Sequence, residues 1–209
     1  MKQQLLSLFP LQVVLFPRTP LPLHIFEERY KQMIADVIAE NSEFGVVLAG
    51  DKGICNMGCS AAVDKIVEKY PDGRMDLLTI GRRRFEILAL DEEKPYLRGE
   101  VTFFDDEEFE PTAEETRQRV LDCYKEMREA GSAEDEGELD VGDSQVSFQI
   151  ADAVPDLNFR QMLLATRSES ERMKQLAEYL PSFASRQRKI QYAKTVAPRN
   201  GHASWPSSL

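Results

Sequence analysis

Two cysteines four positions apart form the most metal-like pattern in the sequence. Cys55 and Cys59 make a C-x-x-x-C pair, and Cys123, His24 and His202 are the other residues that could complete a site. A structural zinc site needs four ligands in tetrahedral geometry. Because no second spaced pair exists, we expect small buried thiols, with no metal ion and no other cofactor.

Residues 45–52 come close to the pattern of a phosphate-binding loop, G-x-x-x-x-G-K-S/T. They spell G-x-x-x-x-G-D-K, but the four residues between the glycines are an apolar run typical of a buried strand. Asp51 would repel phosphate, and no serine or threonine follows Lys52 to hold magnesium. The G-x-S-x-G and H-E-x-x-H patterns are absent as well. The sequence therefore predicts a protein that is not an enzyme.

Two basic segments raise the question of nucleic-acid binding. Residues 82–84 are three arginines in an expected strand, where successive side chains point to opposite faces and cannot form one cluster. Residues 186–194 lie on an expected helix of mixed charge, a pattern typical of a solvated or internally paired face. The formal net charge of −10 also opposes long-range attraction to nucleic acid. RNA is therefore the less favoured partner.

The opening stretch, residues 5–30, contains the best candidate binding surface. Its prolines make the segment rigid, and apolar groups on a rigid segment lose little entropy when they capture an extended peptide. In the competing interpretation, Phe16 and Phe26 belong to the core and the prolines only shape the fold. His24 is expected to be hydrogen-bonded scaffold, or otherwise a pH-sensitive contact. The residues predicted to form the peptide-binding surface and its charged rim are Phe16, Pro17, Arg18, Thr19, Pro20, Phe26, Glu27, Glu28 and Lys31.

Short extended segments must position these residues, because four prolines between positions 10 and 22 rule out one helix or one central strand. The apolar blocks 5–9, 13–16 and 21–26 predict the extended pieces. After Phe26 the apolar period changes to 3.6, which predicts a helix of about three to four turns. Tyr30, Met33, Ile34, Val37 and Ile38 would share its apolar face.

Further strands are expected over 44–49, 62–70, 75–80, 83–90 and 96–104. Pro71-Asp72-Gly73 lies between the second and third of these strands. Proline presets φ and glycine supplies a positive φ, so these residues predict the turn of a β-hairpin.

The character of the chain changes at Asp105. The charge run 105–108 is expected to be a solvated linker rather than a binding site. Helices are expected from 112 to about 129, over 144–154 and 156–166, and from 168 onward until Pro181 ends or kinks the last of them. A basic helix is expected over 185–196. The small, acidic segment 131–143 is expected to be a mobile loop, and the tail 197–209 to be disordered.

Strands that precede helices in this way predict an α+β fold. We expect a β-rich lobe with one early helix over residues 1–104 and a helical lobe over 105–196. No apolar run approaches the roughly 18 residues that a membrane span needs. The odd number of cysteines fits a reducing compartment, so we expect a soluble cytoplasmic protein.

Several motifs together resemble the amino-terminal substrate-binding domain of Lon-type ATP-dependent proteases. The resemblance is good over residues 5–104 and weaker beyond. It implies that the first lobe is a PUA-like pseudo-barrel and that the second is a small helical bundle. The motifs are FPL at 9–11, VLFP at 14–17, LPL at 21–23, IFE at 25–27 and RY at 29–30, followed by FGVVL at 44–48, GCSA at 58–61, PDGR at 71–74 and GRRRF at 81–85.

The resemblance also implies a function. In full-length Lon proteins an ATPase module and a Ser/Lys peptidase module follow this domain, and this chain is expected to end before either of them. We therefore expect a non-catalytic recognition domain that binds unfolded or apolar polypeptide segments, as an adaptor or accessory to ATP-dependent proteolysis. Its partner would be a protease or ATPase. A PUA-like module that binds RNA or a small ligand is the alternative.

Overall fold

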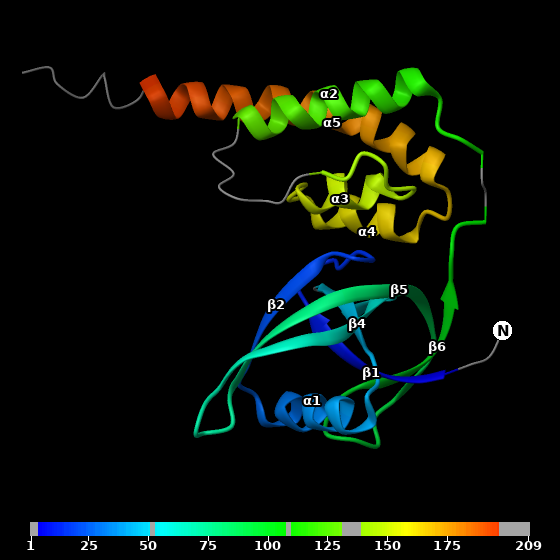
Figure 1. Ribbon diagram of the computed structural model, residues 1–209, viewed down its shortest axis with the longest axis vertical. Helices are drawn as coiled ribbons and strands as arrows, with labels where there is room; N and C mark the ends of the chain where they lie inside the picture. The colour runs from blue at the N-terminus through cyan, green and yellow to red at the C-terminus, as the bar shows by residue number, and fades with distance from the viewer. Residues whose placement is uncertain (1–3, 51–52, 108–109, 131–138, 197–209) are drawn as a thin grey trace, which may run out of the picture.

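The computed structural model describes residues 4–50, 53–107, 110–130 and 139–196. Over these residues it contains a six-stranded sheet and five helices, which confirms the expected α+β fold class. Figure 1 shows four layers along the long axis of the molecule: a pair of helices, a second pair of helices, the curved sheet, and a single helix on the far side of the sheet.

The strands form a nearly closed barrel. Their order is β2-β5-β4-β3-β1-β6, and an additional pairing of β5 with β6 closes a ring of five strands, with β2 attached outside it. β1 is parallel to β3, and the other pairings are antiparallel. This arrangement is the expected PUA-like pseudo-barrel. The strands are β1 (Gln4–Leu11), β2 (Pro20–Ile25), β3 (Phe44–Gly50), β4 (Gly53–Lys69), β5 (Met75–Asp91) and β6 (Arg98–Phe104).

The predicted hairpin is confirmed. β4 and β5 pair in antiparallel fashion, and the amide of Gly73 donates to the carbonyl of Tyr70 across the turn, with Gly73 at a φ of 82°. The division of the next segment was wrong, because 75–80 and 83–90 are one continuous strand, β5. Its first half pairs with β2 and its second half with β6, so no turn is needed between them.

The expected extended piece at 13–16 is not a strand. These residues form an irregular loop, yet Val14, Leu15 and Phe16 are all buried. The apolar pattern therefore identified buried residues correctly. They reach the core from a loop, without forming a strand.

The helix α1 (Glu28–Glu40) covers one side of the barrel, opposite the other helices (Figure 1). Tyr30, Met33, Ile34 and Val37 are buried, as the period of 3.6 predicted. Ile38 is the exception, because 42% of its surface remains exposed.

The remaining helices form the second lobe. Asp156 caps α4, as expected, because its carboxylate accepts hydrogen bonds from the amides of Asn158 and Phe159. The segment 131–138 and the tail 197–209 lie outside the described residues, so the predictions of a mobile loop and a disordered tail rest on the sequence. The helices are α2 (Glu114–Ala130), α3 (Val146–Asp152), α4 (Leu157–Ala165) and α5 (Glu169–Val196).

The expected break at Pro181 does not separate two helices. α5 runs on through Pro181 as one element to Val196, and its ribbon changes direction along its length in Figure 1. An internal proline removes one hydrogen bond and crowds the preceding turn. Packing offsets this cost, because Leu180, Phe183 and Ala184 on both sides of the proline are buried in the helical lobe.

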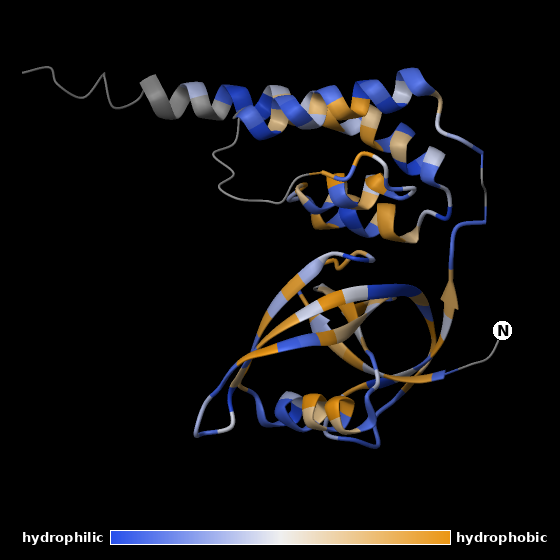
Figure 2. Cartoon of the chain, in the orientation of Figure 1, coloured by the Kyte–Doolittle hydropathy of each residue, from blue (hydrophilic) through white to orange (hydrophobic). Residues whose placement is uncertain are grey.

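The hydrophobic core crosses the boundary between the lobes. One cluster of buried residues includes Phe44 in the barrel, Phe16 in the loop, and Phe148 and Leu176 in the helices. Figure 2 shows hydrophobic residues along the strands and in α3 and α4, whereas α2 is largely hydrophilic. A smaller cluster lies inside the barrel. No helix among the described residues is long and apolar enough to cross a membrane.

Candidate functional site

The structure divides the predicted binding residues between the two ends of β2. Residues 16–20 lie at its start, where the barrel meets the helical lobe, whereas Phe26, Glu27, Glu28 and Lys31 lie beyond its end, beside the hairpin turn. The nine residues therefore do not form one surface.

Phe16 belongs to the core. Its side chain has no exposed surface, its ring stacks on Phe148 with 5.2 Å between the ring centroids, and the Arg160 guanidinium lies 5.3 Å from its centroid. Replacing a phenylalanine buried in this way by alanine usually costs about 3–5 kcal/mol of stability. Phe16 therefore joins the lobes and is not available to a ligand.

Residues 17–20 form a tight loop that is fixed to β5. The Thr19 hydroxyl accepts a hydrogen bond from the Phe16 amide at 3.2 Å and donates to the Phe16 carbonyl at 2.8 Å. Gly81 of β5 donates to the Thr19 carbonyl and accepts from the Arg18 amide. The Arg18 guanidinium then reaches Asp143 at 2.8 Å, so this loop also binds the helical lobe.

Phe26 lies on the surface at the other end of β2. Its side chain is 59% exposed, and its ring stacks on His24 at a centroid distance of 5.9 Å. The edge of Tyr70 faces the same imidazole at 6.2 Å. We call His24, Phe26 and Tyr70 the Phe26 surface.

Hydrogen bonds hold this surface in place. Nδ1 of His24 lies 2.5 Å from Oδ1 of Asp76, and the Tyr70 hydroxyl donates to Oδ2 of the same carboxylate at 2.7 Å. These bonds lower the pKa of Asp76, with the bond to His24 as the larger cause. The bond to Asp76 also raises the pKa of Tyr70 to about 12, so the phenol stays protonated at neutral pH. His24 is thus hydrogen-bonded, as expected for scaffold.

Each of the predicted rim charges has a partner nearby. Lys31 donates to the Glu28 carboxylate at 2.8 Å and to the Asp72 carbonyl at 3.0 Å, which joins α1 to the hairpin turn. Glu27 pairs with Arg29. These charges are compensated, whereas the apolar ring of Phe26 is largely exposed and contacts His24 on one face.

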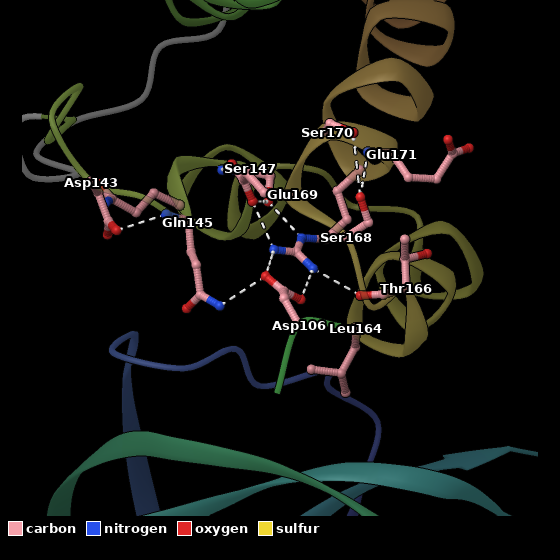
Figure 3. A network of polar contacts seen from close by, with 12 residues as sticks. Asp106, Asp143, Gln145, Ser147, Leu164, Thr166, Ser168, Glu169, Ser170 and Glu171 are labelled. Atoms are coloured by element: carbon pink, nitrogen blue, oxygen red, sulfur yellow. Dashed lines mark hydrogen bonds and ion pairs between the residues drawn. The ribbon is translucent and has the colours of Figure 1, made fainter. Parts of the chain in front are cut away.

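Sequence reasoning missed a buried ion network between the lobes. The charge run 105–108 was expected to be solvated, but the Asp106 side chain is only 11% exposed. Its oxygens accept hydrogen bonds from both terminal nitrogens of Arg172 at 2.7 Å, from Arg84 at 2.6 Å and from Gln145 at 3.1 Å. Figure 3 shows Asp106 below α3 and the start of α5, at the centre of these contacts.

The remaining donors in the network are also satisfied. Arg172 bonds the hydroxyl of Ser147 at 2.8 Å and the carboxylate of Glu169 at 2.7 Å, and Arg84 bonds the carbonyl of Thr166 at 2.7 Å. Burial alone would raise the pKa of Asp106, but the bonds and charge of Arg172, helped by Gln145 and Arg84, lower it to about 2. The carboxylate therefore stays charged and fastens the linker to both lobes.

The three neighbouring arginines do not form one cluster, as predicted, although Arg82 and Arg83 are both exposed and only Arg84 is buried. Arg84 is buried in the network just described, and the Arg83 guanidinium lies 3.7 Å from the ring centroid of Phe103 and pairs with Glu43. Arg82 stays exposed. Hence no continuous basic patch forms at 82–84.

Cys59 and Cys55 give no sign of a metal centre. Cys59 is fully buried, and this burial raises the pKa of its thiol to about 12. Within the part of the chain that the structure describes, no three His, Cys, Asp or Glu side chains lie close enough to hold a metal ion.

Known proteins share both the sequence pattern and the fold. The family model for the ATP-dependent protease La (LON) substrate-binding domain matches residues 6–187 of the 209. The chain belongs to the Lon substrate-binding domain family. The Lon N-terminal domain protein from Xanthomonas campestris has the same fold, with a TM-score of 0.69 and 23% identity over 84% of this chain and 98% of that one.

Two Lon proteases are similar as well. The N-terminal domain of the Mycobacterium avium complex Lon protease has a TM-score of 0.60 at 17% identity, covering 85% of this chain and 98% of that one. The Lon protease of Parabacteroides distasonis is 30% identical over 110 residues, which are 48% of this chain but only 13% of that protein. The match thus spans a small part of the whole protease.

Membership in the Lon substrate-binding domain family bears on the two functions that the sequence left open. The matched domain is the substrate-binding, non-catalytic part of Lon, and the match extends into the helical lobe, where the motifs were weaker. The RNA-binding alternative gains no support from it. Of the two aromatic residues in the predicted site, Phe26 is exposed and Phe16 is buried.

Proposed function

We propose that the protein binds unfolded or apolar polypeptide segments at the Phe26 surface. The observation that carries this proposal is the exposed Phe26 ring, which stacks on a hydrogen-bonded His24 instead of entering the core. A large apolar ring on a rigid support is the kind of group that dominates protein interfaces, because little entropy is lost when it is covered.

The strand beside this surface supports the same function. β2 lies at the end of the sheet order and contains Pro20 and Pro22. The carbonyls of Thr19 and Leu21 point toward β5, where they accept from the Gly81 amide and the Thr79 hydroxyl. Because backbone groups alternate in direction along a strand, the amide and carbonyl positions of residues 20, 22 and 24 point toward the free edge. Two of these three positions lack an amide donor. The edge therefore resists pairing with another sheet while Phe26 stays accessible.

The wider role follows from the family. We propose that the bound segments are delivered to an ATP-dependent protease, with this protein as an adaptor or accessory. The match covers only 13% of the Lon protease of Parabacteroides distasonis, so the activity of that whole protease is a property of the relative. Cys55, Cys59 and Cys123 are free thiols, which suits the reducing cytoplasm that we propose as the location.

Fluorescence anisotropy of the purified chain tests the binding step. The probes are reduced, carboxymethylated α-lactalbumin, which is permanently unfolded, and a single-stranded RNA, each at low and high salt. We expect the polypeptide to bind at both salt concentrations, since apolar contacts are not screened, and the RNA to bind at neither.

Phe26→Ala should weaken polypeptide binding about tenfold, the loss typical of an aromatic residue that anchors an interface. Tyr192→Ala is the matched control, because Tyr192 is an exposed aromatic residue in the helical lobe. Equal affinity for the wild type and a folded Phe26→Ala variant would refute the site. Binding of RNA alone, abolished by salt, would refute the function.

A further inference from the structure

β4 extends beyond β3, the strand that pairs with one of its edges. β3 begins at Phe44, which pairs with Ala61, so residues 62–69 of β4 pair with β5 on one side and with no described strand on the other. The backbone amides and carbonyls along such an edge are free to pair with an added strand. Residues 64–69 are also exposed without interruption.

A groove of about 350 Å³ follows this free edge. It lies between β4 and the C-terminal half of α1, and two large apolar side chains on opposite sides remain partly uncovered, Ile38 at 42% and Ile66 at 43% exposure. A groove between a helix and a strand edge suits an extended peptide, whose backbone pairs with the strand while alternate side chains enter the groove. The residues that line it include Val37, Ile38, Val63, Asp64, Lys65, Ile66 and Arg82.

The uncompensated charge in the groove is positive. Glu43 is engaged by Arg83 and by the hydroxyl of Ser60. The side chains of Arg82, Lys65 and Asp64 have no ion-pair partner among the residues that the structure describes. Two cations against one anion make this a locally basic site on a protein whose net charge is −10.

We propose that this groove is a second polypeptide site, which takes a short extended segment that combines apolar and acidic residues. The segment pairs with the free edge of β4, places an apolar side chain between Ile38 and Ile66, and directs a carboxylate to Arg82 and Lys65. The inference shares with the proposed function only that the ligand is a polypeptide, because none of these residues belongs to the Phe26 surface.

Two irregularities in β4 set the length of the segment. The register with β5 shifts between Val63 and Lys65 and again between Ile66 and Glu68, as expected where a bulge interrupts a strand edge. The first shift lies within residues 62–66 and the second directly follows them, so an added strand can pair regularly only over two short stretches, 62–63 and 65–66. The whole stretch 62–66 spans roughly 16 Å at about 3.3 Å per residue. With so few backbone bonds, the side-chain contacts must supply most of the selectivity.

Two labelled eight-residue peptides test the proposal by anisotropy, one alternating isoleucine with glutamate and one alternating isoleucine with lysine. The glutamate peptide should bind and the lysine peptide should bind at least several-fold more weakly. Lys65→Glu and Arg82→Glu should each weaken binding of the glutamate peptide roughly three- to fivefold. Lys125→Glu makes the same charge change on exposed α2 and should have no effect.

Hydrogen exchange then locates the bound peptide. Amides at 62–66 should exchange more slowly in its presence, and Ile66→Ser should remove this protection. Equal binding of the two peptides, full affinity in Arg82→Glu, or protection elsewhere would overturn the proposal. If Phe26→Ala abolishes binding of carboxymethylated α-lactalbumin while Arg82→Glu leaves the peptide unaffected, the groove is refuted and the proposed function stands. If the glutamate peptide binds and carboxymethylated α-lactalbumin does not, the proposed function is refuted and the groove stands.

Discussion

Asp106 shows how much of this structure depends on single buried charges. Its carboxylate lies between Arg84 of the barrel and Arg172 of α5, and both guanidinium groups are almost completely buried. Removing one member of such a network leaves the others charged and without a partner, which usually costs about 3–5 kcal/mol. The segment after β6 thus contributes to stability by connecting the barrel to the helical lobe through Asp106.

The network predicts a specific dependence of stability on pH. The folded pKa of Asp106, about 2, lies below the usual value of 3.8, so the charged form stabilises the fold at and above pH 4. As pH falls from about 4 to 2, the carboxylate is protonated and about 2 kcal/mol should be lost. Denaturant titrations of the wild type and Asp106→Asn should therefore differ most at pH 6 and converge toward pH 2. A constant difference between the two would contradict this assignment.

At the residue level the sequence predicted properties that depend on neighbouring residues better than contacts between distant residues. The prediction that Arg82, Arg83 and Arg84 do not form one cluster agrees with the structure, because Arg84 is buried while Arg82 and Arg83 are exposed. Strict alternation would have placed Arg82 and Arg84 on one face, but the register of β4 and β5 shifts between Cys59 and Ala61. The burial of Asp106 could not be foreseen, because it depends on Arg172, which is 66 positions away. The burial of Phe16 could not be predicted for the same reason, since its stacking partner Phe148 belongs to the other lobe.

At the scale of elements, the loop 16–19 and β5 act as one unit. Backbone bonds connect Gly81 with Arg18 and Thr19, and a methyl group added at Gly81 would lie only 2.0 Å from the Phe16 carbonyl oxygen. A side chain at this position would push the loop away from the strand. It would also displace Phe16, through which the barrel contacts the helices.

Gly81→Ala should therefore destabilise the protein by at least about 1–3 kcal/mol, the usual cost of overpacking. Gly50→Ala is the control, because among the described residues an added methyl group there would meet only the Gly53 carbonyl oxygen, at an ordinary 3.9 Å. Thermal melts should show a lower midpoint for the first variant and little change for the second. Equal midpoints would mean that the loop moves aside at no cost.

Local sequence signals predicted most elements but not their continuity. The turn at Gly73, the cap at Asp156 and the period of α1 each appear within a few residues, and each is present. β5 and α5 were both divided too early, at Gly81 and at Pro181. Pairing with β2 and β6 carries β5 onward, and packing carries α5 past its proline, so tertiary contacts overrode both local breaks.

At the scale of the whole molecule, the lobes share one core. The cluster that contains Phe44 also contains Phe148, and Arg84 and Asp106 add a polar connection. The division into two domains between residues 104 and 105 stays a prediction from the sequence. Residues on both sides of this boundary pack into the same core.

We therefore expect the two lobes to unfold in one transition. In hydrogen exchange at increasing denaturant, protected amides of β3 and β5 should be lost together with those of α4 and α5. If the helical amides exchange at a clearly lower denaturant concentration, the lobes are separate cooperative units and the contacts at Phe16 and Asp106 are weaker than we infer.

The order of strands also constrains how the chain is made. β1 lies between β3 and β6, and Leu5 pairs with Glu100. During synthesis β1 emerges first but cannot complete its pairing until β6 has left the ribosome, because contacts between distant segments form late. Until then Leu6 and Leu8 lack Val101 of β6, which belongs to their core cluster. The nascent chain thus exposes an apolar strand of the same kind that we propose the finished protein binds.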